Sequence, residues 1–333
     1  MKDVAALAGV SLKTVSRVVN DEPGVSPDVR DRVQVAVNRL DYRPNLAASN
    51  LRRTGARTGL IGALVQDISN SFSASLLRAL EDSARRHGIG VLAASLDEGA
   101  EREQELVHDL VTRRVDGLVI MPASERQDYL VSELRSGTPA VFVDRPPRGV
   151  DADSVTVDNL RGGRLAGEHL LAQGHRRIAA LVDLETIPTA ARRLAGFTDA
   201  YAQRGLRPDP RLVVTGLRST DEATEVMHAL LSLDDPPTAV FTARNILSTG
   251  VVRALAERGL RRDVALVGFD DFPLADLLDP PLTVIRQDVA RIGKTVAELL
   301  FDRIDGNTSP PRHVVHEPTL VVRGSGEIPP PVS

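Results

Sequence analysis

The sequence predicts a small all-α head at the N-terminus and a larger α/β body built as two doubly wound lobes. Apolar residues in the first 44 residues recur at helical spacing. From residue 59 onward, short apolar runs alternate with helical stretches, which favours parallel sheets with helices on both faces. The alternation resumes at residue 161, and this repetition indicates a second, similar lobe.

Length and composition limit the class of protein. A chain of 333 residues favours two or three compact units, and no apolar run approaches the roughly 18–20 residues that span a bilayer. No apolar signal-peptide core is visible, and the lack of cysteine excludes disulfides, thiolate zinc sites and cysteine nucleophiles. We expect a cytoplasmic protein with no membrane partner, no metal and no cofactor.

Residues 3–20 predict two short helices that break at Gly9. Ser11 can begin the second helix by accepting a backbone N–H. The residues expected to face inward are Val4, Leu7, Ala8, Val15, Val18 and Val19. The outward face of the second helix is short, polar and cationic, with Lys13, Thr14, Ser16 and Arg17. Such a unit is a helix-turn-helix, whose second helix has the size and the donors to read base edges in a major groove.

A third helix completes the head, which we expect to cover residues 1–44. Ser26, Pro27 and Asp28 are a strong helix start. The inward positions that follow are Val29, Val33, Ala36, Val37 and Leu40. Residues 1–60 hold ten Lys or Arg and six Asp or Glu, a net +4 ahead of a remainder of −8, so attraction to phosphate would be confined to one end. A chance local excess of basic residues is the alternative.

Residues 45–58 separate the head from the body. The stretch 45–51 is compatible with a helix but far too short to be stable alone in water. It would become ordered only against a partner. The alternative is a plain linker with a nascent turn.

The elements of the body follow from short apolar runs for strands and one-sided apolar spacing for helices. In the first lobe we expect strands at 60–65, 91–92, 117–120 and 140–143, and helices at 72–87, 101–114 and 129–136. In the second lobe we expect strands at 178–182, 213–214, 239–241 and 265–267, and helices at 161–173, 190–203, 222–232 and 248–258.

The head and the body together resemble the lactose-repressor family of transcription regulators over residues 2–325. The matching motifs are residues 3–20, Asn-x-Phe at Phe72, Arg-x-x-Gly-aromatic at Arg193 and Gly-aromatic-Asp-Asp at Asp270. The resemblance implies a periplasmic-binding-protein-like (type I) body whose chain crosses between the lobes near 157–158, 286–287 and 316–318. The lobes would then be 59–157 with 288–316 and 158–287 with 317–328, followed by a tail at 329–333. The Pro-rich tail lacks the leucine repeat of tetrameric members, so we expect a homodimer.

The resemblance also implies the parts that bind DNA. Two copies of 45–51 in a dimer would enter the minor groove together, where Ala48 allows close approach and Leu51 wedges between base pairs. Ser49 and Asn50 depart from the family pattern at that step. Bases would be approached by Ser11, Leu12, Lys13 and Arg17 with Thr14 on the same face, the DNA backbone by Ser16 and Asn20, and phosphate by Tyr42 and Asn45. The family's capping Thr is missing before Lys2, so we expect either a start codon further upstream or a frayed first helix.

Polar residues just after the predicted strands are the candidates for a small-molecule site, because open α/β lobes bind ligands at the carboxyl ends of their strands. They are Asp67, Asn70, Phe72, Asp144, Arg145, Thr189, Arg193, Arg244, Asn245, Asp270 and Gln287. Carboxylates and amides hydrogen-bond vicinal hydroxyls, and an aromatic ring covers an apolar sugar face, so the set fits a polyhydroxylated ligand. The alternative for each Asp or Asn is a helix cap.

Arg244 departs from the family pattern, since Arg244-Asn245 stands where the family commonly has Asn-Asp. One hypothesis is that Arg244 favours an anionic ligand, such as a phosphorylated or acid sugar. The alternative is that Arg244 pairs with a nearby Asp or faces solvent.

Catalytic and metal motifs are weak. The glycines near residues 59–62 and 162–163 lack the spacing of a dinucleotide fingerprint, and no P-loop or nucleophile motif stands out. His313 and His316 would point to opposite faces of a strand, so they do not indicate a metal site. We expect no enzyme.

The sequence therefore predicts a ligand-responsive transcription regulator, a repressor of sugar or related catabolic genes. It would bind a palindromic operator as a dimer, and an effector in the cleft between the lobes would release or recruit it. The alternative is a sugar-binding protein of the transport type without DNA binding, which would need export.

Overall fold

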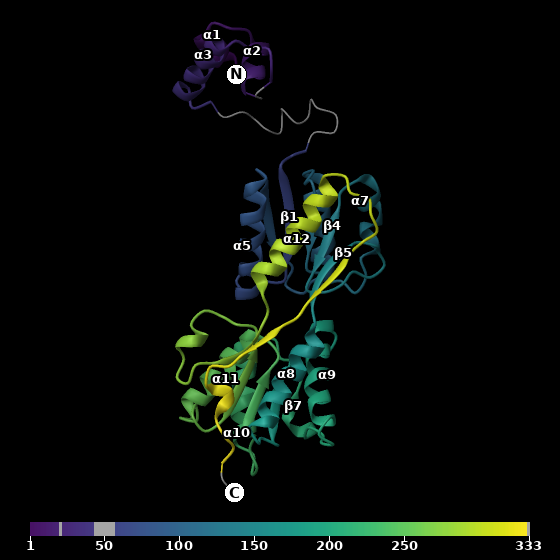
Figure 1. Ribbon diagram of the computed structural model, residues 1–333, viewed down its shortest axis with the longest axis vertical. Coiled ribbons are helices and arrows are strands. Elements are labelled where there is room, and N and C mark those ends of the chain that lie inside the picture. The colour runs from purple at the N-terminus through teal and green to yellow at the C-terminus, as the bar shows by residue number, and fades with distance from the viewer. Residues whose placement is uncertain (20–21, 43–56, 332–333) are drawn as a thin grey trace. The chain divides into compact units, whose positions relative to one another are not determined.

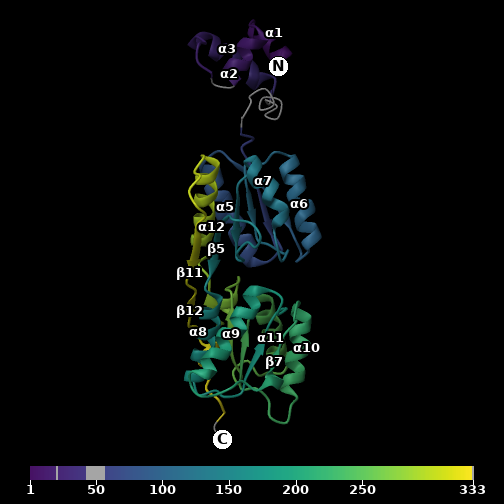
Figure 2. The same cartoon turned by 90° about the vertical axis from the view of Figure 1, so that its right-hand side faces the viewer.

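The structure, a computed structural model, describes residues 1–19, 22–42 and 57–331. The chain forms two compact units, Met1–Thr58 and Gly59–Ser333, and each is described by itself. Figure 1 and Figure 2 show the helical unit and the body with its two lobes. The predicted fold class, a helical head and a two-lobed α/β body, is confirmed.

The head contains α1 (Lys2–Ala8), α2 (Leu12–Val19) and α3 (Pro27–Arg39). Gly9 ends α1 with a left-handed φ of 64°, which glycine adopts without strain. Ser11 Oγ accepts the Thr14 backbone N–H at 3.1 Å, as expected for the residue that begins α2. The buried core is Val4, Ala5, Ala8, Val15, Val18, Val33 and Ala36.

Two inward assignments in the head are wrong. Leu7 is 46% exposed and Leu40 is 43% exposed. Ala5 and Leu7 flank the same Val4–Ala8 pair on α1, and the helix buries the side of Ala5. Leu40 lies just beyond the end of α3, so it no longer follows the helical spacing.

The first lobe is a six-stranded parallel sheet in the order β11-β5-β4-β3-β1-β2. Its strands are β1 (Leu60–Val65), β2 (Gly90–Ser95), β3 (Leu118–Ile120), β4 (Ala140–Val143), β5 (Asp153–Val157) and β11 (His313–His316). On one face, α5 (Ser71–Arg86) and α12 (Val289–Ile304) close a core around Leu76, Leu80 and Val296. On the other face lie α6 (Ala100–Thr112), the 3-10 turn Asp128–Leu130 and α7 (Val131–Ser136).

The second lobe is also six-stranded, in the order β12-β10-β9-β8-β6-β7, and only β12 runs antiparallel to its neighbour. Its strands are β6 (Ile178–Leu181), β7 (Val213–Val214), β8 (Ala239–Thr242), β9 (Ala265–Phe269), β10 (Thr283–Arg286) and β12 (Thr319–Val321). One face carries α8 (Asn159–Ala172) and α9 (Pro188–Ala202), and the other α10 (Thr220–Leu231) and α11 (Asn245–Glu257). Short 3-10 turns lie at Pro210–Leu212, Ala275–Leu277 and Ser325–Glu327.

Three connections join the lobes. The chain leaves the first sheet from β5 into α8, returns from β10 into α12, and crosses again from β11 to β12. Figure 1 shows these segments side by side in the waist of the body. The carboxyl ends of the parallel strands of both sheets face each other, and this arrangement creates the site described below.

Helices α8 and α9 cross with their backbones in near contact. A Cβ at Gly196 would lie 1.9 Å from the carbonyl oxygen of Leu160, and a Cβ at Gly163 would lie 1.9 Å from that of Arg193. Only glycine fits at either position, and the close crossing fixes the backbone position of Arg193 on α9. Its side chain reaches the cavity between the lobes.

Replacing Gly196 with Ala is expected to destabilise the body and to lower its Tm. Overpacking of this kind costs about 1–3 kcal/mol, and a backbone oxygen yields less easily than a side chain. Thermal unfolding followed by circular dichroism measures the effect. Thr198→Ala, an exposed change on the same helix, is the control, and an equal Tm for both variants would contradict the role of the crossing.

Candidate functional site

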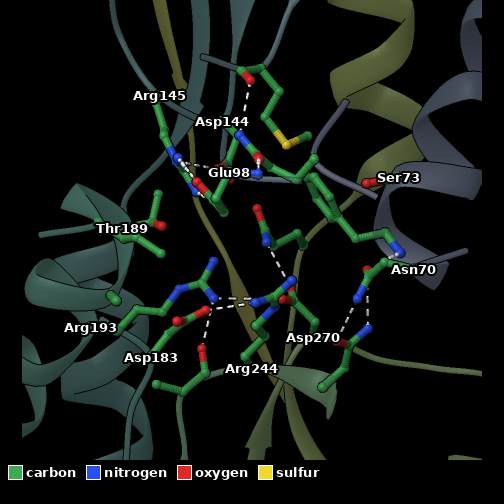
Figure 3. Close-up of a pocket in the computed structure, with 18 residues that line it drawn as sticks. Asn70, Ser73, Glu98, Asp144, Arg145, Asp183, Thr189, Arg193, Arg244 and Asp270 are labelled. Atoms are coloured by element: carbon green, nitrogen blue, oxygen red, sulfur yellow. Dashed lines mark hydrogen bonds and ion pairs between the residues drawn. The ribbon is translucent and has the colours of Figure 1, made fainter. Parts of the chain in front are cut away.

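A cavity of about 60 Å³ lies between the two lobes at the carboxyl ends of their strands. Ten of the eleven predicted ligand residues line it: Asn70, Phe72, Asp144, Arg145, Thr189, Arg193, Arg244, Asn245, Asp270 and Gln287. Figure 3 shows most of them converging from elements of both lobes. Choosing the polar residues just after the strands, which we call the strand-end rule, thus identified residues that are up to 217 positions apart in the chain but line one cavity.

Asp67 is the exception, since it does not line the cavity. Its Oδ1 accepts hydrogen bonds from the Ser69 backbone N–H at 2.8 Å and the Ser69 hydroxyl at 2.7 Å. Asp67 therefore stabilises the turn before α5, whereas the residue that caps this helix is Asn70. The residue before it, Gln66, lines the cavity instead.

The wall from the first lobe is built around Arg145. Its guanidinium makes a bidentate ion pair with Glu98, at 2.7 and 2.6 Å, and donates to the Pro122 carbonyl oxygen at 2.9 Å. Asp144 has a left-handed φ of 69° that aims the strand end at the cavity. Burial raises the pKa of the Asp144 carboxyl, and the nearby Arg145 and Arg193 oppose the rise.

The wall from the second lobe is built around Arg193. Its Nε donates to Asn159 Oδ1 at 2.7 Å, and its Nη1 donates to the Ala243 carbonyl oxygen at 2.8 Å and lies 3.5 Å from Asp270 Oδ2. The guanidinium also stacks 3.7 Å above the centre of the Phe269 ring. Burial lowers the pKa of Arg193, although Asp270 and Asp144 oppose the fall. These contacts together hold the Arg193 side chain in a single conformation.

Asp270 and Gln287 form the end of the cavity next to the crossing strands. Gln287 Nε2 donates to Asp270 Oδ1 at 2.6 Å. Gln287 Oε1 is buried, and among the described residues no group donates to it. A buried acceptor without a donor carries a free-energy cost that a ligand hydroxyl would remove.

Arg244 pairs with Asp183, whose Oδ2 lies 2.6 Å from Arg244 Nη1. The structure thus has the ion pair that the sequence offered as the alternative to an anion site. Asp183 itself was not among the predicted residues.

Hydrogen bonds between the lobes close one side of the cavity. Asn70 Nδ2 in the first lobe donates to Asn245 Oδ1 in the second at 3.0 Å, and Asn245 Nδ2 donates to Ser71 Oγ at 2.8 Å. Asn70 also caps α5 by accepting from the Phe72 backbone N–H at 3.0 Å. We call Asn70, Ser71 and Asn245 the amide clasp. The clasp therefore joins the two lobes directly at one side of the cavity.

Four polar residues of the cavity were not predicted from the sequence, namely Gln66, Ser73, Glu98 and Asp183. Gln66 and Asp183 follow β1 and β6 closely, so the strand-end rule applied to every strand would have found them. Glu98 lies three residues after the end of β2, in a turn where its own φ is 57°, and it still lines the cavity. The apolar lining residues Met121, Ile187, Ala190 and Ala243 give no signal that separates them from core.

The exposed face of α2 is the candidate DNA-binding surface. Ser11, Leu12 and Lys13 are exposed, and Thr14, Ser16 and Arg17 are half-buried around the same helix. Tyr42 packs partly against the head core. Four further predicted contacts, Asn20, Asn45, Ala48 and Leu51, lie outside the described residues.

Other site types have less support. Within residues 1–19, 22–42 and 57–331, no group of three or more His, Cys, Asp or Glu side chains is placed to hold a metal ion. None of the helices in these ranges is long and apolar enough to cross a membrane.

Comparison with known proteins agrees with the geometry of both units. Residues 1–45 match the family of bacterial regulatory proteins called lacI, and residues 168–326 match a periplasmic binding protein-like domain. Among curated proteins, the transcriptional repressor CytR of Escherichia coli K12 is 31% identical over 98% of this chain and 95% of its own length. The repressor PurR of Pasteurella multocida is also 31% identical and covers 98% of both chains.

Solved structures give the same result. The Lac repressor dimer bound to operator and an anti-inducer is 30% identical, with a TM-score of 0.84 over 97% of this chain and 98% of that one. The regulator CelR in complex with cellobiose is 32% identical, with a TM-score of 0.72 and the same coverage. These relatives share the head as well as the body, so nothing favours a transport protein. The chain belongs to the lacI family of bacterial regulatory proteins and is a ligand-responsive, DNA-binding transcriptional repressor.

Proposed function

We propose that this repressor binds a palindromic operator as a homodimer and that a sugar or related polyol in the cavity between the lobes controls it. The cavity carries the proposal, since its lining combines carboxylates, amides and guanidiniums with a single aromatic side chain, Phe72. Alternating donors and acceptors suit vicinal hydroxyls, and one ring covers one apolar sugar face. A nucleobase would gain more from two stacking rings.

Two relatives support the ligand class. CelR is described in complex with cellobiose. A regulator from Alkaliphilus metalliredigens, 25% identical over 80% of this chain with a TM-score of 0.71, is described in complex with D-xylulofuranose. We extend this class to the present chain and propose that it represses genes for the use of its effector. The protein acts by binding alone, without catalysis, in the cytoplasm where its operator lies.

The DNA contacts of this chain are proposed from the head and from the Lac repressor complex, which is a dimer on its operator. Lys13 and Arg17 lie on α2 with the donors that major-groove reading requires. Two heads in one dimer would read the two halves of a palindrome. Residues 45–51 would become ordered in pairs on the minor groove, with Leu51 as the wedge.

Control by the effector follows from the weakness of 45–51 as an isolated helix. A ligand in the cavity changes the angle between the lobes and so the separation of the two 45–51 segments in the dimer. Segments held apart lose their packing partner, and the two heads then bind as separate modules with lower combined affinity. A coupling of about 1–3 kcal/mol is typical of such control.

Replacing Arg17 with Ala is expected to weaken operator binding by about 1–3 kcal/mol, because a base-reading guanidinium is lost from the groove. A mobility-shift titration against a palindromic operator at fixed salt measures it. Arg39→Ala removes the same charge from the last turn of α3 and serves as the control. Equal losses in the two variants would mean that only net charge matters.

Replacing Leu51 with Gly is expected to reduce both operator affinity and the response to effector, because the wedge and the helix propensity of the segment are lost together. Leu51→Met, which keeps an apolar wedge, should retain both. The same titration with and without effector is the measurement. Unchanged affinity and response in Leu51→Gly would refute the proposed role of 45–51.

Replacing Asp270 with Asn is expected to weaken effector binding about tenfold or more, because Asp270 holds Gln287 and Arg193 through its charge. Asn also tolerates the left-handed φ of 70° at this position, so the fold is retained. Isothermal titration with the sugar that stabilises the wild type gives the affinity, and operator binding without effector should not change. Asp67→Asn, at a strand end outside the cavity, is the control.

A further inference from the structure

The ion pair of Arg244 and Asp183 joins two neighbouring strand ends of the second lobe. Asp183 follows β6, and Arg244 follows β8 and precedes α11. Asp183 Oδ2 accepts from Arg244 Nη1 at 2.6 Å, while Asp183 Oδ1 accepts from the Leu184 backbone N–H at 2.7 Å. Both side chains line the cavity, as Figure 3 shows. The carboxylate is therefore held in place by its own loop, independently of Arg244.

The two partners differ in exposure. The Asp183 side chain is 8% exposed, and the Arg244 side chain is 24% exposed. A charge that loses its partner in a buried site is left uncompensated, and the more exposed group tolerates this better. Loss of the Asp183 charge would leave a guanidinium at the cavity that can receive another anion.

The other guanidiniums of the cavity already have partners. Arg145 is held by Glu98 in a bidentate pair, and Arg193 lies 3.5 Å from Asp270. Asp144 adds a fourth carboxylate to the lining. Three guanidiniums thus face four carboxylates, and no surplus positive charge is available to an anionic ligand.

We propose that Asp183 sets the charge preference of the effector: by neutralising Arg244 it makes the cavity accept neutral polyols and reject sugar acids and sugar phosphates. Asp183 is then a specificity-determining residue, and Arg244 is a latent anion receptor. This inference rests on the proposed effector site. It also favours the alternative in which Arg244 pairs with a nearby Asp over the hypothesis of an anionic ligand.

The variant Asp183→Asn tests the proposal, because it changes charge and hardly changes shape. Its amide oxygen can still accept from Leu184, whereas an amide NH₂ cannot accept from a guanidinium, so Arg244 is released. Ser at the same position keeps an acceptor for Leu184 and is the second variant. Glu185→Gln is the matched control, since Glu185 is an exposed carboxylate on the same loop and outside the cavity lining.

The experiment uses the full-length protein and measures Tm and affinity with D-ribose, D-xylose and D-glucose and with ribose 5-phosphate, glucose 6-phosphate and D-gluconate. The wild type and Glu185→Gln should respond to neutral sugars and to none of the anions. Asp183→Asn should bind at least one anion about tenfold or more tightly than the wild type, the gain expected for one charge-assisted hydrogen bond. Adding Arg244→Gln to Asp183→Asn should abolish this gain.

Three results would overturn the inference. The first is a rise in the Tm of the wild type with the sugar acids or sugar phosphates, which can be measured without any variant. The second is Asp183→Asn or Asp183→Ser that folds and binds operator but gains no anion response. The third is an equal gain in Glu185→Gln. If no sugar or anion affects any variant, the proposed effector class fails as well, whereas a wild-type response to neutral sugars without the gain overturns this inference alone.

Discussion

The pairing of buried charges around one small cavity is the constraint on which the rest of the body depends. Seven charged side chains line a space of about 60 Å³. A charge removed from water is tolerated only when a partner of opposite sign and further hydrogen bonds replace its hydration. Each guanidinium accordingly has a carboxylate close by, and two of them also donate to backbone carbonyl oxygens. The side chains of the site are therefore already paired before any ligand binds. The hydroxyls of a ligand must compete with hydrogen bonds and ion pairs that already exist.

The fold supplies the rigidity that such pairing needs. The near contact of α8 and α9 at their glycines fixes the backbone position of Arg193. The Phe269 ring and Asn159 fix the position of its guanidinium. By contrast, the amide clasp consists of uncharged hydrogen bonds, whose net contribution is modest, about 1 kcal/mol each. The hydrogen-bonded ion pairs of the cavity thus lie within each lobe, whereas the hydrogen bonds of the clasp between the lobes are uncharged. This division suits a body that keeps its binding groups in place while the lobes change their angle.

Much of this could be predicted from the sequence because strand ends are easy to read. Apolar runs locate the strands, and the parallel topology sends their carboxyl ends to one edge, so the polar residues that follow converge. The prediction fails where a local choice depends on tertiary packing. Asp67 and Gln66 are adjacent, and only the twist of the chain after β1 decides which one faces the cavity. Ala5 and Leu7 flank the same helical stripe, and only the position of the neighbouring helices decides which one is buried. The partner of Arg244 lies 61 residues away, just after a neighbouring strand, and no spacing rule connects the two.

The threefold crossing between the lobes has a consequence for biosynthesis. The first sheet contains β11, and its face is covered by α12, yet both elements come after the second lobe in chain order. A ribosome therefore releases most of the second lobe before the first can close its core. Domains that are continuous in sequence fold as they emerge, N-terminal first, and this body cannot follow that order. Nascent β1 to β5 must wait with the part of one face that α12 covers still open, although α5, α6 and α7 are already made. This exposed apolar surface makes the elongating chain a client for chaperones, and a premature stop anywhere before α12 would leave neither lobe complete.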